Sequence, residues 1–226
     1  MLGAMRRIAV AAFAAALLAA TAAAAARSAP PPRPRVTVIG DSVVTAVQDT
    51  TQARQLLARN VDLHFLAVVC RRLVQQSCWY LGVRPPTALD VIQANATSLG
   101  DTVIVESGYN EYVQQYASDL DTVMNALVAA GVQTVLWVNL REERPDYATM
   151  NDQIRAAAAK WPQLVIVDWN TASRNRPWFG DDGLHLNLQG ALGMARLLRK
   201  YVVTYACDGS CLRATRAGRS SAVSVQ

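Results

Sequence analysis

The chain has 226 residues, of which 52% are hydrophobic and 17% are charged, and its formal net charge is +5. Residues 1–26 hold 14 alanines and only two charged side chains, both arginine, so the remaining 200 residues carry a net charge of +3. That remainder has the composition of an ordinary globular domain and is long enough to bury a core. The composition therefore argues against a membrane protein with several spans, a disordered chain and a strongly basic nucleic-acid binder.

The first 26 residues have the layout of a secretory signal peptide. Two arginines precede an apolar run over residues 8–20, and small residues suited to cleavage follow. An uncleaved membrane anchor is the alternative, but the run is mostly alanine, which is weakly hydrophobic for crossing about 30 Å of hydrocarbon. We therefore expect a secreted protein, or one at the exterior of the cell envelope, with no stable membrane span after cleavage. Residues 27–35 are rich in proline and are expected to form an extended linker.

Short β-branched runs alternate with helical stretches after this linker. The runs predict buried strands over residues 36–39, 61–68, 102–106, 132–138 and 164–167. Helices are expected over residues 43–60, 87–99, 118–130, 150–161 and 187–205. Five hydrophobic strands separated by helices predict a five-stranded parallel sheet covered on both faces, which is a three-layer α/β/α sandwich of the flavodoxin-like type. This domain is expected to span residues 36–211, with a flexible tail over 212–226.

The four cysteines fit an oxidising compartment, where an even number indicates disulfides. Cys70 is close to Cys78 in the sequence, and Cys207 is close to Cys211. We therefore expect these two local pairs among the three possible connectivities. A zinc site is the alternative, but the chain has no Cys-x-x-Cys pair and only two histidines. Neither a metal nor another cofactor is expected.

Gly40, Asp41 and Ser42 follow the first predicted strand and open the first predicted helix. The amide groups at a helix start are unpaired, so a serine there can attack a carbonyl while its own N–H supports the developing oxyanion. Serine also commonly caps a helix, and on this tripeptide alone capping is the better interpretation. A catalytic role for Ser42 therefore needs partners elsewhere in the chain.

Asp182 and His185 supply one such set of partners, just before the last predicted helix. Their spacing lets the carboxylate meet the imidazole Nδ1 and leaves Nε2 to accept a serine proton. A surface histidine beside a solvated aspartate is the alternative. The second histidine, His64, lies within an apolar strand and is expected to be a packed structural residue.

A third segment, Gly108 to Glu111, follows the third predicted strand. The amide of Asn110 can donate to the same oxyanion, although asparagine is also common in turns. The three segments follow strands or precede the last helix, so the topology of a parallel sheet brings them to one edge. Their combination is more specific than any of them alone.

The motifs Gly40-Asp41-Ser42, Gly108-Tyr109-Asn110-Glu111 and Asp182-Gly183-Leu184-His185 resemble blocks I, III and V of the SGNH (GDSL) hydrolase superfamily. The resemblance covers residues 36 to about 203, and Cys70-Arg71-Arg72 resembles the Cys-Arg-Arg arrangement of secreted actinobacterial esterases of this superfamily. It implies that Ser42 is the nucleophile, that His185 is the general base and acid, and that Asp182 orients the histidine. It also implies that the Ser42 amide and the Asn110 side chain stabilise the oxyanion.

The sequence departs from the pattern of this family at two places. Block III usually ends in aspartate, and here Glu111 takes that position. Block II usually supplies a glycine amide to the oxyanion hole, but this chain has no glycine there, so Cys70 or Arg71 is expected to fill the role. A disulfide from Cys70 to Cys78 is expected to fix that loop. The side chains expected to line the substrate are Asp41, Tyr109 and Trp178.

The resemblance implies a secreted serine esterase that hydrolyses small acyl esters, such as an O-acetyl sugar or a short-chain ester, through an acyl-enzyme on Ser42. One alternative is a cell-wall polysaccharide or peptidoglycan O-acetyltransferase that uses the same residues. The other is a non-catalytic cell-surface binding module on the same fold, which the complete serine, histidine and aspartate set disfavours. The expected partner is a small-molecule or carbohydrate ester and not a nucleic acid, and the expected state is a monomer.

Overall fold

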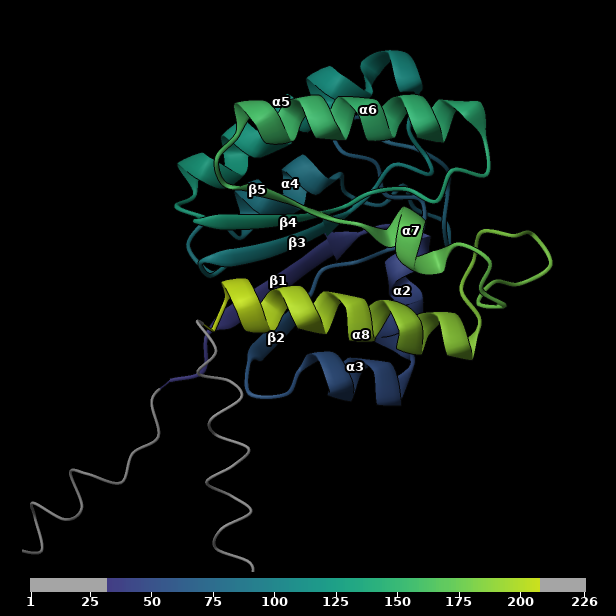
Figure 1. Cartoon of the computed structure of the whole chain (residues 1–226). Coiled ribbons are helices and arrows are strands. Elements are labelled where there is room, and N and C mark those ends of the chain that lie inside the picture. Colours follow the sequence, from purple (N-terminus) through teal and green to yellow (C-terminus); the bar gives the residue numbers. More distant parts are fainter. Residues whose placement is uncertain (1–31, 208–226) are drawn as a thin grey trace, which may run out of the picture. The chain divides into compact units, whose positions relative to one another are not determined.

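The computed structural model describes residues 32–207, and all of its elements belong to the unit Pro34–Gln226, one of two into which the chain divides. A five-stranded sheet has the order β2-β1-β3-β4-β5, and every pair of neighbours is parallel. The strands are β1 (Arg35–Gly40), β2 (Asp62–Phe65), β3 (Thr102–Glu106), β4 (Thr134–Val138) and β5 (Leu164–Val167). This order is the flavodoxin-like one, so the predicted fold class is confirmed (Figure 1).

Helices cover both faces of the sheet (Figure 1). They are α2 (Ser42–Asp49), α3 (Thr51–Leu57), α4 (Ala88–Ala94), α5 (Val113–Ala129), α6 (Pro145–Lys160), α7 (Trp169–Ser173) and α8 (Leu188–Tyr205). Successive strand residues point to opposite faces, so in β3 Val103 and Val105 pack under α4, α5 and α6. Ile104, between them, packs into the second core with α2, α3 and α8. None of the helices in residues 32–207 is long and apolar enough to cross a membrane.

Several boundaries differ from those predicted from the sequence. The helix expected over residues 43–60 is interrupted at Thr50, whose extended backbone ends α2 and begins α3. The helix expected from residue 150 begins earlier, at Pro145, because proline suits the first turn, where an N–H is not needed. The short helix α7, capped by Asp168, was not predicted.

His64 contradicts its predicted packed position. It lies in β2, an edge strand whose residues alternate between exposed and half-buried, and its own side chain is exposed. The predicted signal peptide (1–26), most of the linker (27–35) and the tail (212–226) lie outside the described residues.

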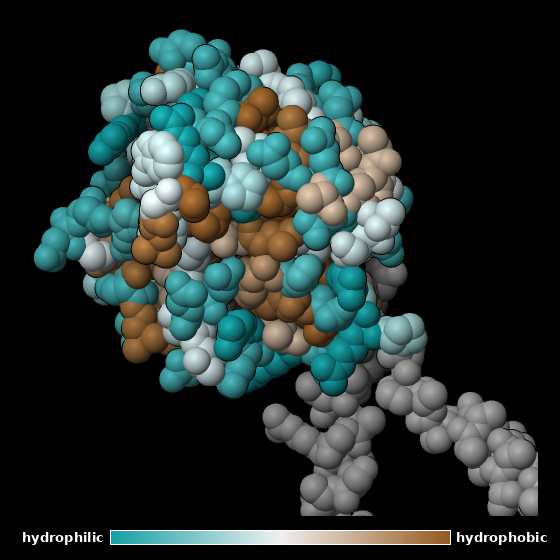
Figure 2. Space-filling view, turned by 180° about the vertical axis from the view of Figure 1, so that it is seen from behind, coloured by the Kyte–Doolittle hydropathy of each residue, from teal (hydrophilic) through white to brown (hydrophobic). Residues whose placement is uncertain are grey.

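Some large hydrophobic side chains of the described residues lie outside both cores. Figure 2 shows the face opposite to that of Figure 1, where hydrophobic residues are exposed among hydrophilic ones. The most exposed of the large hydrophobic residues are grouped in the loop between β2 and α4, namely Leu81, Trp79 and Val83, together with Tyr112 just before α5. The core that holds the sheet is therefore complete without these side chains.

Trp178 fastens the segment between α7 and α8 to the rest of the domain. Its ring stacks on Trp169 with the ring centroids 5.7 Å apart. Gly190 and Gly193 of α8 make room for it, since a Cβ on Gly190 would overlap the Trp178 carbonyl oxygen and one on Gly193 would lie 2.8 Å from the ring. The N–H of Asn187 donates to the Trp178 carbonyl at 3.0 Å. The packing of Trp178 therefore fixes the position where the loop that carries Asp182 and His185 begins.

Gly190→Ala tests the packing of Trp178 against α8. The new methyl group overlaps the Trp178 carbonyl, so we expect the free energy of unfolding to fall by about 1–3 kcal/mol, the usual cost of overpacking. Gln189→Ala, at the exposed neighbouring position of the same helix, is the control and is expected to change stability by less than about 0.5 kcal/mol. Urea denaturation of both variants measures the difference. Equal stabilities would contradict the close packing of Trp178 on α8.

Candidate active site

Ser42 is the first residue of α2, and the helix cap is its neighbour Asp41. The Asp41 side chain accepts a hydrogen bond from the Val43 N–H at 3.0 Å. The Ser42 hydroxyl is therefore not used for capping, which removes the alternative interpretation of this serine. Its Oγ lies instead 3.0 Å from Nε2 of His185, a residue 143 positions further along the chain.

His185 is held in turn by Asp182. The imidazole Nδ1 lies 2.5 Å from Asp182 Oδ2, while the N–H groups of Leu184 and His185 both donate to Asp182 Oδ1 at 2.9 Å. The hydrogen bond with His185, followed by those from the two backbone amides, holds the pKa of Asp182 well below its usual value. Both side chains are about half exposed, at 52% for His185 and 51% for Asp182. The structure thus aligns serine, imidazole and carboxylate at an accessible position.

Arg141, which the sequence analysis did not single out, braces the loop that carries Asp182 and His185. It follows the end of β4, and its Nη1 donates to the Gly183 carbonyl at 2.8 Å. Its guanidinium also lies 3.9 Å from the centroid of the Phe179 ring. Within the loop, the Gly180 N–H donates to the His185 carbonyl at 2.8 Å. The position of Arg141 after a strand of a parallel sheet, where ligand sites gather, was the sequence signal that could have identified it.

The loop after β2 supplies the predicted block II residues. Cys70 and Cys78 form the predicted disulfide, with Cα atoms 5.5 Å apart, and Cys70 has a φ of 67°, in the left-handed region that glycine favours. The Arg71 N–H donates to the Val68 carbonyl at 3.3 Å, whereas within residues 32–207 the Cys70 N–H has no hydrogen-bond partner. This geometry favours Cys70 over Arg71 as the backbone donor. Cys211, and with it the second predicted pair, lies outside the described residues.

The side chain of Arg71 supports the loop from within. It is 4% exposed, and its guanidinium donates to the carbonyls of Leu66 and Pro86. Burial lowers the pKa of Arg71 to about 10. These two contacts join widely spaced positions of the block II loop and so restrain its conformation. Arg71 therefore contributes to the structure of the loop through its side chain rather than through its backbone amide.

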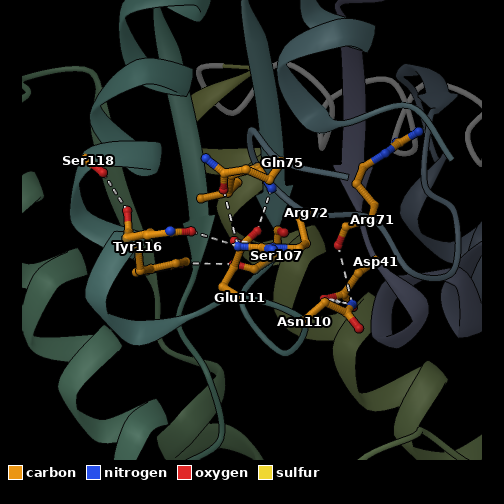
Figure 3. Close-up of polar contacts among 11 residues, drawn as sticks. Asp41, Arg71, Arg72, Gln75, Ser107, Asn110, Glu111, Tyr116 and Ser118 are labelled. Atoms are coloured by element: carbon orange, nitrogen blue, oxygen red, sulfur yellow. Dashed lines mark hydrogen bonds and ion pairs between the residues drawn. The ribbon is translucent and has the colours of Figure 1, made fainter. Parts of the chain in front are cut away.

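Asn110 connects the three loops of the site (Figure 3). Its Nδ2 lies 3.4 Å from Asp41 Oδ2 and 3.4 Å from the Arg71 carbonyl oxygen. Both bonds are long, so they orient the amide while leaving it able to exchange one of them for a stronger acceptor. A developing oxyanion is such an acceptor.

Glu111 and Arg72 form a buried ion pair beside Asn110 (Figure 3). Their Oε2 and Nε atoms are 3.0 Å apart, and the side chains are 0% and 6% exposed. The other carboxylate oxygen of Glu111 accepts from the Leu73 N–H at 2.5 Å. Burial raises the pKa of Glu111, and the bonds from Leu73 and Arg72 act against that rise. The glutamate that departs from the family pattern thus ties the loop after β3 to the loop after β2.

The three side chains expected to line the substrate have mainly structural contacts. Asp41 is 0% exposed, which corrects its predicted position: the carboxylate is turned inward to cap α2. The hydroxyl of Tyr109 accepts from the Arg141 N–H at 2.8 Å, and its ring meets that of Tyr147 edge-on at 5.1 Å. Trp178 is occupied by its packing on Trp169 and α8.

Arg72→Met tests the link between the two loops. It leaves the Glu111 carboxylate buried without its cation, so we expect a loss of about 3–5 kcal/mol in the free energy of unfolding. Arg155→Met, which breaks the exposed Arg155–Asp152 pair, is the matched control and is expected to cost less than about 1 kcal/mol. Adding Glu111→Leu to Arg72→Met removes the unpaired charge and should restore part of the loss. A double variant no more stable than Arg72→Met would contradict the coupling, and chemical denaturation measures all four proteins.

No protein-family model matches the chain. Over 110 residues, or 48% of the chain, the sequence is 32% identical to the O-acetyltransferase OatA of Staphylococcus aureus, and the matched segment is 17% of that protein.

Among solved structures, a carbohydrate acetylesterase family member from Sinorhizobium meliloti matches 76% of this chain and 98% of its own, with a TM-score of 0.58 and 13% identity. TesA matches 74% of this chain and 95% of its own, with a TM-score of 0.55 and 17% identity. A protein described as a GDSL-like lipase, from Bacteroides ovatus, matches 78% of this chain and 54% of its own, with a TM-score of 0.53 and 13% identity. At these identities the structural likeness establishes the fold, and this chain has the fold of the SGNH (GDSL) hydrolase superfamily.

Proposed function

We propose that this chain is a secreted serine esterase that hydrolyses small acyl esters, such as O-acetylated sugars or short-chain esters. The observation that carries the proposal is the row of contacts from Ser42 Oγ to His185 Nε2 at 3.0 Å and from His185 Nδ1 to Asp182 at 2.5 Å. Ser42 Oγ attacks the ester carbonyl as His185 takes its proton, and His185 returns that proton to the leaving alcohol. A water molecule, deprotonated by His185, then attacks the acyl-enzyme and releases the acid.

The start of α2 suits the stabilisation of the oxyanion. The amides of Val43 and Val44 donate to the carboxyl groups of Asp41 and Glu106, so the Ser42 N–H is left for the substrate. In our proposal the Asn110 amide and the Cys70 N–H complete the set of donors. Each such donor contributes a factor of about 10²–10³ to the rate when it points at the position where charge develops.

The accessibility of the site supports a substrate with a large alcohol part. Because His185 and Asp182 are half exposed, the reacting hydroxyl is open to an ester carried on a long polymer such as a polysaccharide. Export fits the N-terminal sequence pattern and the Cys70–Cys78 disulfide, since disulfides persist in oxidising compartments.

Ser42→Ala and His185→Ala test the assignment of nucleophile and base. We expect each to lower kcat/KM for p-nitrophenyl acetate by at least about 10³-fold, because each removes a participant in the bond-making step. Ser118→Ala, at an exposed serine of α5, is the control and should leave kcat/KM unchanged. A series of p-nitrophenyl esters with longer acyl groups is expected to show an optimum at short chains. Full activity in Ser42→Ala would refute the proposed mechanism.

Acetyl transfer to a sugar hydroxyl is the second candidate function. The match to the O-acetyltransferase OatA specifically favours it, and the same acyl-enzyme would serve. The two functions differ in whether water or a carbohydrate hydroxyl receives the acyl group. Incubating the protein with p-nitrophenyl acetate and a soluble polysaccharide, and measuring free acetate and O-acetylated glycan by mass spectrometry, separates them. Under our first proposal free acetate accounts for nearly all of the p-nitrophenol released; acetylated glycan as the main product would favour transfer.

A further inference from the structure

The carboxyl group of Glu106 lies beside that of Asp41 at the start of α2 and takes no part in the mechanism above. Glu106 ends β3 and is the register partner of Gly40 at the end of β1. The Asp41 N–H donates to the Glu106 backbone carbonyl at 3.1 Å, and the Glu106 side chain reaches under α2, where Oε2 accepts from the Val44 N–H at 3.3 Å. Glu106 is 1% exposed and Asp41 is 0% exposed. Two carboxyl groups are therefore buried together beside the start of α2, where Ser42 lies.

The surroundings of this pair supply too little positive charge for two carboxylates. Within residues 32–207, no arginine, lysine or histidine forms an ion pair with Asp41 or Glu106. The other titratable groups that interact electrostatically with the pair are His185, Arg71 and Tyr147, which act on Asp41. Tyr109 and Tyr116 interact with both carboxyl groups. The guanidinium of Arg71 is occupied by backbone carbonyls. Two buried like charges in contact cannot both ionise, so the pair retains a proton.

The hydrogen bonds decide which carboxyl group holds that proton. Asp41 accepts from the N–H groups of Val43 and Gly108 and from the Asn110 amide, and these donors favour its charged form. Glu106 accepts from Val44, while its Oε1 receives no donor from the described residues and is free to carry the proton. Burial, and after it the charge of Asp41, raises the pKa of Glu106 well above its usual value. The two carboxyl groups act on each other directly, so in the hydrogen bond that the retained proton makes, Glu106 is the donor and Asp41 the acceptor.

We infer that Glu106 is a positioning residue that works as a neutral hydrogen-bond donor, holding the Asp41 carboxylate in the orientation that caps α2 and aligns Asn110. The proton of Glu106 points to Asp41, whose two oxygens receive the Val43 N–H and the Asn110 amide. One proton on Glu106, a residue that touches no substrate, thus fixes the position of the turn that carries Ser42 and the orientation of the Asn110 amide. The kinetic part of this inference rests on the proposed esterase function, whereas the protonation of Glu106 does not.

Glu106→Gln and Glu106→Leu separate a donor from a space-filling side chain. Glutamine presents an N–H to Asp41 and an oxygen to Val44, as protonated Glu106 does, whereas leucine offers neither. We expect Glu106→Gln to keep kcat for p-nitrophenyl acetate within about threefold of the parent. We expect Glu106→Leu to lower kcat about 100-fold with a smaller change in KM, since misplaced catalytic groups cost rate more than binding. Equal losses in the two variants would overturn the positioning role.

The pH dependence of stability tests the proton without any substrate. Unfolded, Glu106 releases its proton near its ordinary pKa of 4.5, whereas in the folded protein it keeps the proton to a higher pH. The unfolded chain then binds fewer protons than the native one, so the parent loses stability as pH rises above about 4.5 until Glu106 ionises in the fold. Glutamine lacks this loss. We therefore expect the unfolding constant of the parent, divided by that of Glu106→Gln, to rise by up to about tenfold per pH unit.

Urea denaturation of the parent and Glu106→Gln between pH 4.5 and pH 8 measures this ratio. A ratio independent of pH would overturn the neutral state of Glu106, whatever the esterase assay gives. A rising ratio with no esterase activity in the parent would uphold the shared proton and contradict the proposed function instead. If Glu106→Leu does not fold, the comparison of the parent with Glu106→Gln still decides the protonation, and their kcat values still decide whether the donor suffices.

Discussion

Gly40 and Glu106 face each other where β1 and β3 end, and the strands approach so closely there that a Cβ on Gly40 would lie 2.5 Å from the Glu106 carbonyl oxygen. This approach brings the chain leaving β1, with Asp41 and Ser42, against the chain leaving β3, with Asn110. Any side chain at position 40 would separate the two strand ends and displace the cap of α2. The proposed nucleophile, the proposed oxyanion donor and the buried carboxyl pair all depend on this one contact between neighbouring strands.

The loops around that contact are each tied down by a different kind of interaction. A disulfide closes the loop after β2, and the buried Arg72–Glu111 pair joins it to the loop after β3. Arg141, after β4, holds the Gly183 carbonyl, and Trp178 packs the start of the same segment against α8. Every strand end next to the site therefore contributes a restraint. The proposed reacting groups can stay exposed because contacts beneath them fix their positions.

The parts of this arrangement that the sequence predicts are those with a local signal. The strands over residues 102–106 and 164–167 stand out as short apolar runs, and both have the predicted bounds. The site segments were found because serine and asparagine after strands and histidine before the last helix suggest chemistry when they are taken together. His64 was misjudged because its strand lies at the edge of the sheet, and strand order is not visible in an apolar run.

The supporting residues had no comparable signal. The partners of Glu106 and Arg141 are 62 and 42 positions away in the chain, and a glutamate at the end of an apolar strand reads as its polar boundary. Likewise, Gly190 and Gly193 suggest a less stable helix when only the sequence is considered. The structure shows that Trp178 packs where a side chain at either position would lie. Such roles come from contacts between distant segments, so a pattern read along the chain cannot contain them.

The site places carboxyl groups in two opposite environments, and this contrast divides their tasks. Asp182 is half exposed, and its hydrogen bond with His185 keeps its pKa low, so it stays charged and can stabilise an imidazolium without an electrostatic penalty for burial. Asp41 and Glu106 are buried, where burial raises the pKa of both, so together they favour retention of a proton. In the proposed mechanism, the carboxylate that responds to charge during the reaction is half exposed, while the pair that holds a fixed geometry is buried. A site that exchanged these environments would have an aspartate unable to support His185 and a turn below Ser42 that hydrates and loosens.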